Sequence, residues 1–315
     1  MKLIHRFLLI CCCLAIVQPL TAAWRNTQTS SEPQLIIIDS WLTGYFGGFF
    51  RAKEKRFKQA WKTANRRAKS DARIWGGLFV SDSTRSGGYR FGEVVSRFTY
   101  QAPQTAAGFL TAQWYNTVLG KVNTVEYAFG ATSLNMRVDW LGVTLGNYIL
   151  ADTSIHAQPN NRMFQHEYGH YLQSKRMGLA YFVRVGLPAI MSKGNHDAHP
   201  VEVDCNRQAF LYFNQNFPDF QNDSLLTDAK GWDFGFNPFP DSLHQGIKRQ
   251  GVCYVDYRDS LQVSRLESLR VKATFIDYAS WIIPPLGPIV VGMIHARRYN
   301  KLQVKSESLK TAPNP

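Results

Sequence analysis

The sequence predicts an α+β fold in which a small sheet of mixed or antiparallel strands accompanies several helices. Three observations predict it. Apolar residues recur at helical spacing within residues 51–73, stretches rich in Val, Tyr, Thr and Ile begin near residue 124, and two helical segments begin near residues 161 and 200. The chain has 315 residues, 45% of them hydrophobic and 19% charged, so it can bury a core and does not have a disordered composition.

Residues 1–23 have the layout of a secretory signal peptide. Lys2 and Arg6 give a positive start, an apolar run follows, and the small residues "TAA" close the segment. An uncleaved membrane anchor is the alternative. A cysteine triplet at residues 11–13 makes lipidation a minor alternative, against which the bulky residues before it argue. We therefore expect an exported protein, whether periplasmic, at the cell surface or secreted.

Two cysteines, Cys205 and Cys253, follow the signal segment. In an exported chain they could form a disulfide, and two unlinked buried thiols are an equal alternative. The sequence does not point to thiol chemistry.

Positive charge is concentrated in residues 51–73, where ten of 23 residues are Lys or Arg, within a chain of net charge +13. Phe57, Trp61, Ala64 and Ala68 fall at helical spacing and predict a basic amphipathic helix. Such a helix could bind an anionic membrane surface or nucleic acid. It could also present a solvated face, which we prefer for an exported protein, and no nucleic-acid motif accompanies it.

The segments around this helix are less regular. Residues 34–50 are apolar and contain glycine, which predicts a helical hairpin with the basic segment or a surface-associated region. Residues 76–120 show no clear period. Residues 124–152 read as two or three short strands punctuated by glycine.

Residues 278–294 carry no charge and are interrupted by Pro284, Pro285 and Pro288. At 17 residues the segment is at the lower limit for a membrane span. We expect a buried helix pair, with a membrane contact as the alternative.

The stretch "QHEYGHYLQSKRMG" contains the pattern that points to chemistry. Asn161 can cap a helix that Gly178 ends, and within it His166 and His170 lie four residues apart, on one face. This spacing places two imidazoles at adjacent corners of a tetrahedral zinc site. Glu167 is turned about a quarter of a circle away, where it can act on a water as general base.

Gly169 lies between the two histidines, and glycine inside a helix costs about 1 kcal/mol relative to alanine. It is tolerated where something must approach the backbone closely, and a purely structural helix has little reason to carry it beside two histidines.

A third ligand is expected from the run "HPVEVDCNRQAF", which starts a second helix at Pro200. We choose Glu202 over Asp204, because the two side chains point roughly apart. Asn206 is four residues after Glu202, on the same face, and could hold a histidine ligand through a hydrogen bond. A metzincin would have glycine and histidine where this chain has Gln173 and Arg176, so that class is excluded.

Other residues could complete the site. An oxyanion donor is expected among His199, Tyr254, His196 and His244. The histidines at 156, 196 and 199 could instead be metal ligands, although loop histidines without metal are more common. The strand "GNYILAD" before the motif could bind an extended peptide by edge pairing.

"HEYGH" followed by "EVDCN" resembles the gluzincin pattern of two histidines and a glutamate on zinc, with Cys205 where alanine is usual. The longer run "TLGNYILAD…PNNRMFQHEYGHYLQSKRMG", with "GWDFGFNP" beyond it, resembles the zincin-like domain at the carboxyl ends of RHS-type secreted proteins and of standalone relatives in Bacteroidetes-like bacteria. This resemblance implies a zincin-like fold: a small sheet packed on the motif helix and a second ligand-bearing helix, with further helices at both ends.

The resemblance covers roughly residues 110–302 and sets the expected division of the chain. The expected parts are a signal peptide (1–23), an N-terminal apolar and basic region (24–109), a zincin-like domain (110–302) and a disordered tail (303–315).

The sequence therefore predicts an exported zinc metallopeptidase acting on a peptide or protein, with Zn²⁺ on His166, His170 and Glu202 and with Glu167 as general base. A non-catalytic zincin-like module, serving as an effector, an adaptor or a membrane-associated protein, is the alternative. An intact Glu167 argues against it, because a structural zinc site needs no carboxylate directed at water.

Overall fold

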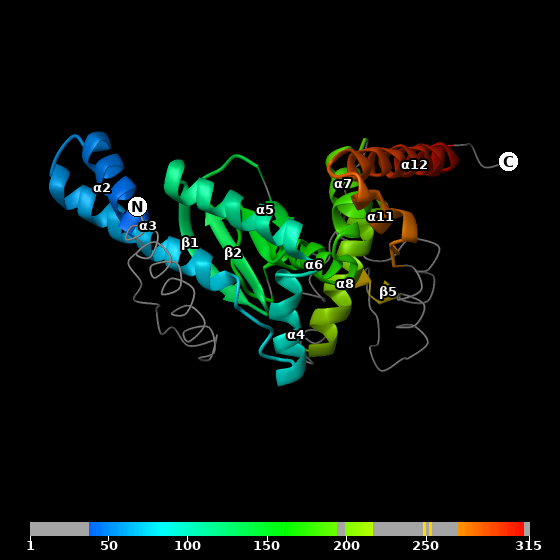
Figure 1. The fold of residues 1–315 in the computed structure, drawn as a ribbon. Helices are drawn as coiled ribbons and strands as arrows, with labels where there is room; N and C mark the ends of the chain where they lie inside the picture. The colour runs from blue at the N-terminus through cyan, green and yellow to red at the C-terminus, as the bar shows by residue number, and fades with distance from the viewer. Residues whose placement is uncertain are drawn as a thin grey trace. The chain divides into compact units, whose positions relative to one another are not determined.

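In the computed structural model the described residues are 38–140, 142–159, 161–193, 199–216, 248–249, 252–253 and 270–311. Helices are combined with a small mixed sheet, so the predicted α+β class is confirmed (Figure 1). The signal segment lies outside the described residues.

The chain divides into two compact units. Unit 1 contains the described residues up to 99 together with 105–158, and unit 2 contains residues 100–104 and the described residues from 159 onward. The boundary between the expected parts 24–109 and 110–302 lies within helix α5 (Ala102–Gln113), which the two units also share. The expected division therefore stays a prediction.

Unit 1 begins with a helical hairpin of α2 (Ile38–Arg51) and α3 (Arg56–Gly77), as expected for residues 34–50 and the basic segment (Figure 1). Phe57 and Trp61 are exposed, while Ala64 and Ala68 are buried, so the expected apolar face of α3 is wrong at its two aromatic positions. The face of α3 that packs inward is a stripe of alanines. Between α3 and the sheet, where the sequence has no clear period, the chain forms α4 (Gly87–Arg97), α5 and the π-helix η1 (Trp114–Val118).

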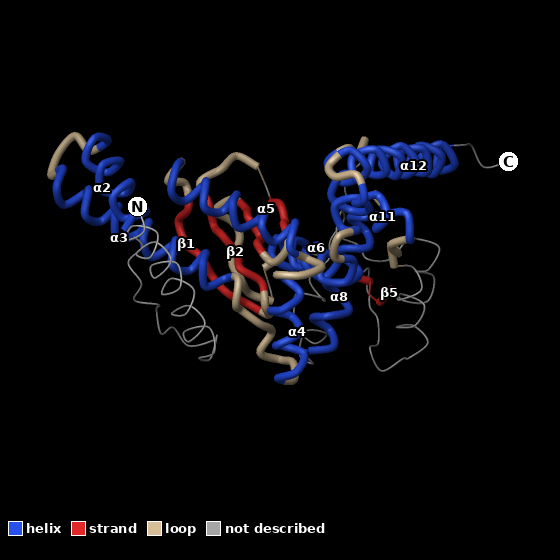
Figure 2. The backbone as a smooth tube through the Cα atoms, in the orientation of Figure 1, coloured by secondary structure: helices blue, strands red, loops and turns tan. Residues whose placement is uncertain are grey.

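The strands fall where the sequence predicts them, but there are four instead of two or three. They are β1 (Val122–Ala128), β2 (Ala131–Met136), β3 (Gly142–Leu145) and β4 (Tyr148–Ala151). Their order is β1-β2-β4-β3, with β2 and β4 parallel and the other pairs antiparallel. Figure 2 shows the strands of the sheet in red. Phe129 and Gly130 have φ of 51° and 84°, which permits a two-residue turn between β1 and β2.

The expected edge pairing of a peptide on "GNYILAD" is wrong. The segment forms β4, which lies inside the sheet with β2 on one side and β3 on the other. Its backbone groups are therefore already paired on both sides.

Side chains from α3, α5 and the sheet form the core of unit 1. Its buried members are Ile74, Ala112, Val122, Val125, Leu134, Met136, Tyr148 and Leu150. The Tyr148 hydroxyl donates to the carbonyl of Ile74 over 2.8 Å, so the one polar end in this cluster is satisfied. Each fully buried aliphatic side chain of this kind stabilises the fold by about 1.5–3 kcal/mol.

Unit 2 contains the two helices predicted to carry the ligands, α6 (Arg162–Met177) and α8 (Pro200–Asn216). Asn161 caps α6 by accepting from the Phe164 amide over 2.9 Å, and Gly178, with φ of 54°, ends it, as the sequence predicts. The remaining elements are η2 (Phe182–Gly186), α7 (Leu187–Ile190), β5 (Lys248–Arg249), β6 (Val252–Cys253), α11 (Phe275–Ala279), η6 (Ser280–Ile282) and α12 (Leu286–Thr311).

Two expectations for the C-terminal segment are wrong. Residues 278–294 do not form a buried pair, because α12 packs on α7 by one face, where Gly292 meets Leu187, and leaves Leu286, Val290 and Ile294 exposed. The tail from 303 is helical as far as Thr311, since residues 303–311 contain no glycine or proline that would interrupt α12. Within the described ranges we find no helix long and apolar enough to cross a membrane.

Candidate metal centre

Helices α6 and α8 approach each other closely at Gly169. A Cβ atom on this residue would lie 2.1 Å from the carbonyl oxygen of Cys205, so only glycine allows the two backbones to come so near. This explains a glycine in the middle of a helix, for the reason that the sequence suggested. The close approach brings side chains of the two helices together on either side of Gly169.

Four potential ligands meet there: His166, His170, Glu202 and Cys205, whose donor atoms all lie within 4.8 Å of one another. Oε2 of Glu202 is 2.9 Å from Nε2 of His170 and 3.4 Å from Nε2 of His166. The histidines are at most 9% exposed and Glu202 is fully buried. The cluster could therefore hold a metal ion.

The second nitrogen of each imidazole is already engaged. Nδ1 of His166 is 2.9 Å from Oδ1 of Asn206, and Nδ1 of His170 is 2.9 Å from Oε1 of Gln173. The amide nitrogen of Gln173 donates to the Val201 carbonyl and to Asp204, so its oxygen must be the atom that faces His170.

Because each Nδ1 faces an amide oxygen, a neutral ring at either position donates from Nδ1 and directs its Nε2 lone pair toward the carboxylate of Glu202. Two lone pairs and an anion that converge in a buried space require a cation between them. Two imidazoles and a carboxylate oriented in this way suit a divalent metal, and outer hydrogen bonds of this kind are typical of metal-binding histidines.

Without a metal, protons take the place of the cation. Burial would raise the pKa of Glu202, but His170 and His166 hold it well below its ordinary value. Burial would lower the pKa of His170, but Cys205 and Glu202 together raise it well above its ordinary value. The site thus binds positive charge both with a metal ion and without one, when the histidines are protonated.

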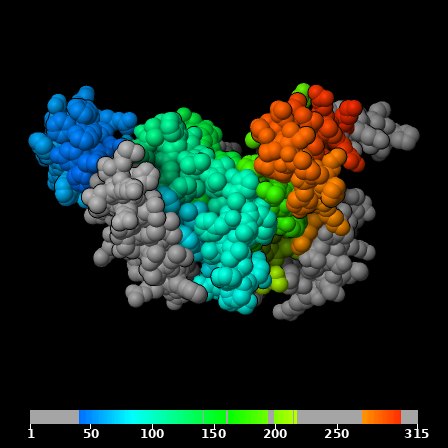
Figure 3. Space-filling view, viewed as in Figure 1, coloured from blue at the N-terminus to red at the C-terminus, as the bar shows by residue number. Residues whose placement is uncertain are grey.

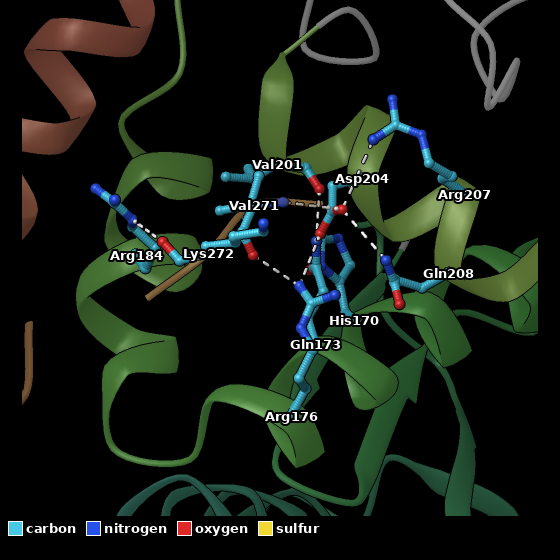
Figure 4. A network of polar contacts seen from close by, with 10 residues as sticks. All are labelled: His170, Gln173, Arg176, Arg184, Val201, Asp204, Arg207, Gln208, Val271 and Lys272. Atoms are coloured by element: carbon cyan, nitrogen blue, oxygen red, sulfur yellow. Dashed lines mark hydrogen bonds and ion pairs between the residues drawn. The ribbon is translucent and has the colours of Figure 1, made fainter. Parts of the chain in front are cut away.

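Asp204, the alternative ligand, is not a member of this cluster. Figure 4 shows its carboxylate in contact with Arg207 and Gln208. Its carboxylate accepts hydrogen bonds from Gln173 at 2.7 Å, from the Val271 amide at 3.1 Å and from Arg176 at 3.3 Å. Gln208 and Arg207 also approach it, at 3.3 and 3.8 Å. This buried carboxylate is compensated by cations and donors and holds Gln173 in place for His170.

The other predicted residues lie at different places. Glu167 is buried in α6, one residue after the first ligand. His199 is buried at the start of α8, its ring 5.5 Å from that of Tyr299. His156 is exposed in unit 1. Tyr254, His196 and His244 lie outside the described residues, as does the side chain of Cys253.

Three residues near this cluster were not predicted as site residues from the sequence: Gln173, Cys205 and Tyr181. Gln173 and Cys205 each follow a ligand by three residues on its helix, and that spacing could have indicated them. Sγ of Cys205 is 3.5 Å from Nδ1 of His166, on the side of the ring that Asn206 also contacts.

Tyr181 is buried beyond the end of α6, and no pattern in the sequence connects it with the ligands. Burial raises the pKa of its phenol. The charges of His170, Glu167 and Glu202 also act on it, His170 lowering the pKa and the two carboxylates raising it. Tyr181 is therefore a protonated hydroxyl within electrostatic reach of the cluster.

Comparisons of the chain with protein-family models, with curated proteins and with solved structures give no match.

Proposed function

We propose that this chain is an exported zinc-dependent metallopeptidase in which His166, His170 and Glu202 hold the metal. The main support is the convergence of two ring lone pairs and a buried carboxylate, with both opposite ring nitrogens held by hydrogen bonds. Two imidazoles and one carboxylate are the ligand set of catalytic zinc sites that keep the fourth position open. Export is supported by the layout of residues 1–23.

Bound zinc would supply a Lewis acid for the scissile carbonyl and lower the pKa of the attacking water. Glu167 takes the proton of that water and passes it to the leaving amine. Asn206 and Gln173 fix the imidazole rings, so that little reorganisation is needed during the reaction. Among the described residues, the buried phenol of Tyr181 is our candidate donor for the developing oxyanion, because the charges of His170 and Glu202 act on it. The ring of His199 instead packs on Tyr299.

One observation favours a second candidate, a structural metal site without catalysis. The thiol of Cys205 lies within the same cluster and could be a fourth protein ligand. Four protein ligands are typical of structural zinc sites, because no position is left for water. The two candidates differ in whether Cys205 binds the metal.

The test is the metal content of the purified mature chain and of three variants, Glu167→Gln, Glu202→Ala and Cys205→Ser. The proposal expects equimolar zinc in the wild type, in Glu167→Gln and in Cys205→Ser, and weak or absent binding in Glu202→Ala. Replacement by Co²⁺ adds a direct reading, because a thiolate ligand gives a sulfur-to-metal charge-transfer band. That band should be absent.

Cleavage of a mixture of unstructured peptides, followed by mass spectrometry, then tests catalysis. We expect cleavage by the wild type and none by Glu167→Gln. A charge-transfer band that disappears in Cys205→Ser would instead establish the structural site. A wild-type chain that takes up no zinc on reconstitution would end the metallopeptidase proposal.

A further inference from the structure

The α2–α3 hairpin packs through its smallest residues. A Cβ atom on Gly44 would lie 2.8 Å from Cα of Ala64, and one on Gly48 would lie 2.9 Å from Cα of Ala60. The two backbones therefore touch along a seam of glycine and alanine. Such a seam has no room for large side chains, so the aromatic residues of the hairpin must lie elsewhere.

Those aromatic residues lie on the outside. Phe46, Phe50, Phe57 and Trp61 are 54%, 78%, 71% and 57% exposed. The rings of Phe46 and Phe50 stack at 6.5 Å, and Phe49 joins the two helices by contacting Phe57 at 5.2 Å. In a helical hairpin of a water-soluble domain the large apolar residues face the partner helix, so this arrangement is the reverse of the usual one.

Positive charge surrounds the exposed rings. Between Arg51 and Lys62 the hairpin exposes six cations and one acidic residue, Glu54. The cations are Arg51, Lys53, Lys55, Arg56, Lys58 and Lys62. Figure 3 shows the hairpin (blue) with its side chains at the surface of this face. Aromatic rings beside a dense group of cations, on an amphipathic helix, form the surface that binds the interface of an anionic bilayer.

We propose that the tip of the α2–α3 hairpin docks on an anionic lipid surface. Phe50 and Phe57 enter the headgroup region, and the surrounding lysines and arginines contact lipid phosphates. A nucleic acid fits less well, because strand-binding surfaces mix cations among the stacking rings, and α2 has no Lys or Arg before Arg51. The proposal is independent of the metal centre.

The test is co-sedimentation of the mature chain with phosphatidylcholine vesicles that contain or lack phosphatidylglycerol. We expect binding to the anionic vesicles only, weakened by salt. Replacing each cation should weaken binding about fivefold, so Lys53→Ala with Lys58→Ala should weaken it about 25-fold. Phe50→Ser with Phe57→Ser should weaken it by about tenfold or more, while leaving the thermal midpoint unchanged because both rings are exposed.

The matched control is Phe275→Ser with Ile282→Ser, which removes two apolar side chains of unit 2 that are 85% and 81% exposed. We expect it to bind vesicles like the wild type. Binding that is lost in this control but kept in the hairpin variants would overturn the proposal. So would tighter binding to a nucleic-acid duplex than to anionic vesicles. A dimer that Phe50→Ser with Phe57→Ser converts to a monomer, without vesicle binding, would assign the surface to a second copy of the chain.

Discussion

Gln173 connects the candidate ligand His170 with the buried carboxylate of Asp204. Its amide oxygen accepts from Nδ1 of His170, and its amide nitrogen donates to Asp204 and to the Val201 carbonyl. The same residue excludes the metzincin pattern in the sequence, and in the structure it orients an imidazole.

We predict that Gln173→Met weakens metal binding about 10–100-fold, because the imidazole loses the acceptor that fixes its orientation. Stability should also fall by about 1–3 kcal/mol, since buried groups lose their partner. Metal affinity is measured by competition with a chromophoric chelator. The control is Gln208→Met, which removes a donor from the same Asp204 carboxylate without touching a histidine. Equal loss of metal affinity in both variants would show that Gln173 acts only through stability.

Individual site residues could be predicted from the sequence where the spacing along one helix alone sets their relative positions. Helical spacing predicted that His166 and His170 share one face of the first helix. It likewise predicted that Glu202 and Asn206 share one face of the second helix. The roles of Cys205 and Tyr181 depend on where α8 and the segment after α6 lie in space. That is a matter of tertiary packing, which one sequence does not reveal.

At the scale of the elements, the close packing of α6 against α8 depends on Gly169, whose side chain is a single hydrogen atom. We predict that Gly169→Ala destabilises unit 2 by about 1–3 kcal/mol, because the added methyl meets the Cys205 carbonyl and the helices must separate. The sign of this change in unfolding free energy is informative, because replacing glycine by alanine in a helix stabilises it by about 1 kcal/mol when the methyl group meets no other atom. Urea unfolding measures the effect.

Gly92 is the matched control. It also lies within a helix, α4, but a Cβ atom added there meets nothing within 4 Å. Gly92→Ala should therefore be neutral or stabilising by up to about 1 kcal/mol. A neutral Gly169→Ala would mean that the helices do not approach as closely as the structure has them.

Local sequence patterns predicted some of the helices and strands but not all of them. Helix α6 could be bounded from its cap and its terminal glycine, and the strands from β-branched residues and glycine turns. Helix α5 was missed because its apolar residues have almost no helical period. Helix α4 has one, but it was missed because three glycines, Gly87, Gly88 and Gly92, lie within it. The apolar face of α3 was wrong at Phe57 and Trp61 because period alone cannot show that glycines on α2 select alanines as partners.

The whole molecule has two compact units, each with its own buried cluster. The cluster of unit 1 consists of the eight buried residues described above for α3, α5 and the sheet. The cluster of unit 2 consists of Met177, Ala180, Tyr181, Val185 and Val201. The zincin-like arrangement implied by resemblance, with a sheet packed on the motif helix, stays a prediction. The sheet belongs to unit 1, while every residue of the candidate metal centre belongs to unit 2.

This separation predicts a local response to metal removal. A metal that binds the folded state of unit 2 stabilises it by about 2.7 kcal/mol at a free concentration 100 times the Kd. Chelation should therefore speed hydrogen exchange in α6 and α8, up to about 100-fold, and leave β2 and β4 unchanged, as read by mass spectrometry. Glu202→Ala should exchange equally with and without chelator. If β2 and β4 lost protection together with α6 and α8, the units would unfold as one, and the metal would stabilise the whole chain instead of the unit that holds its ligands.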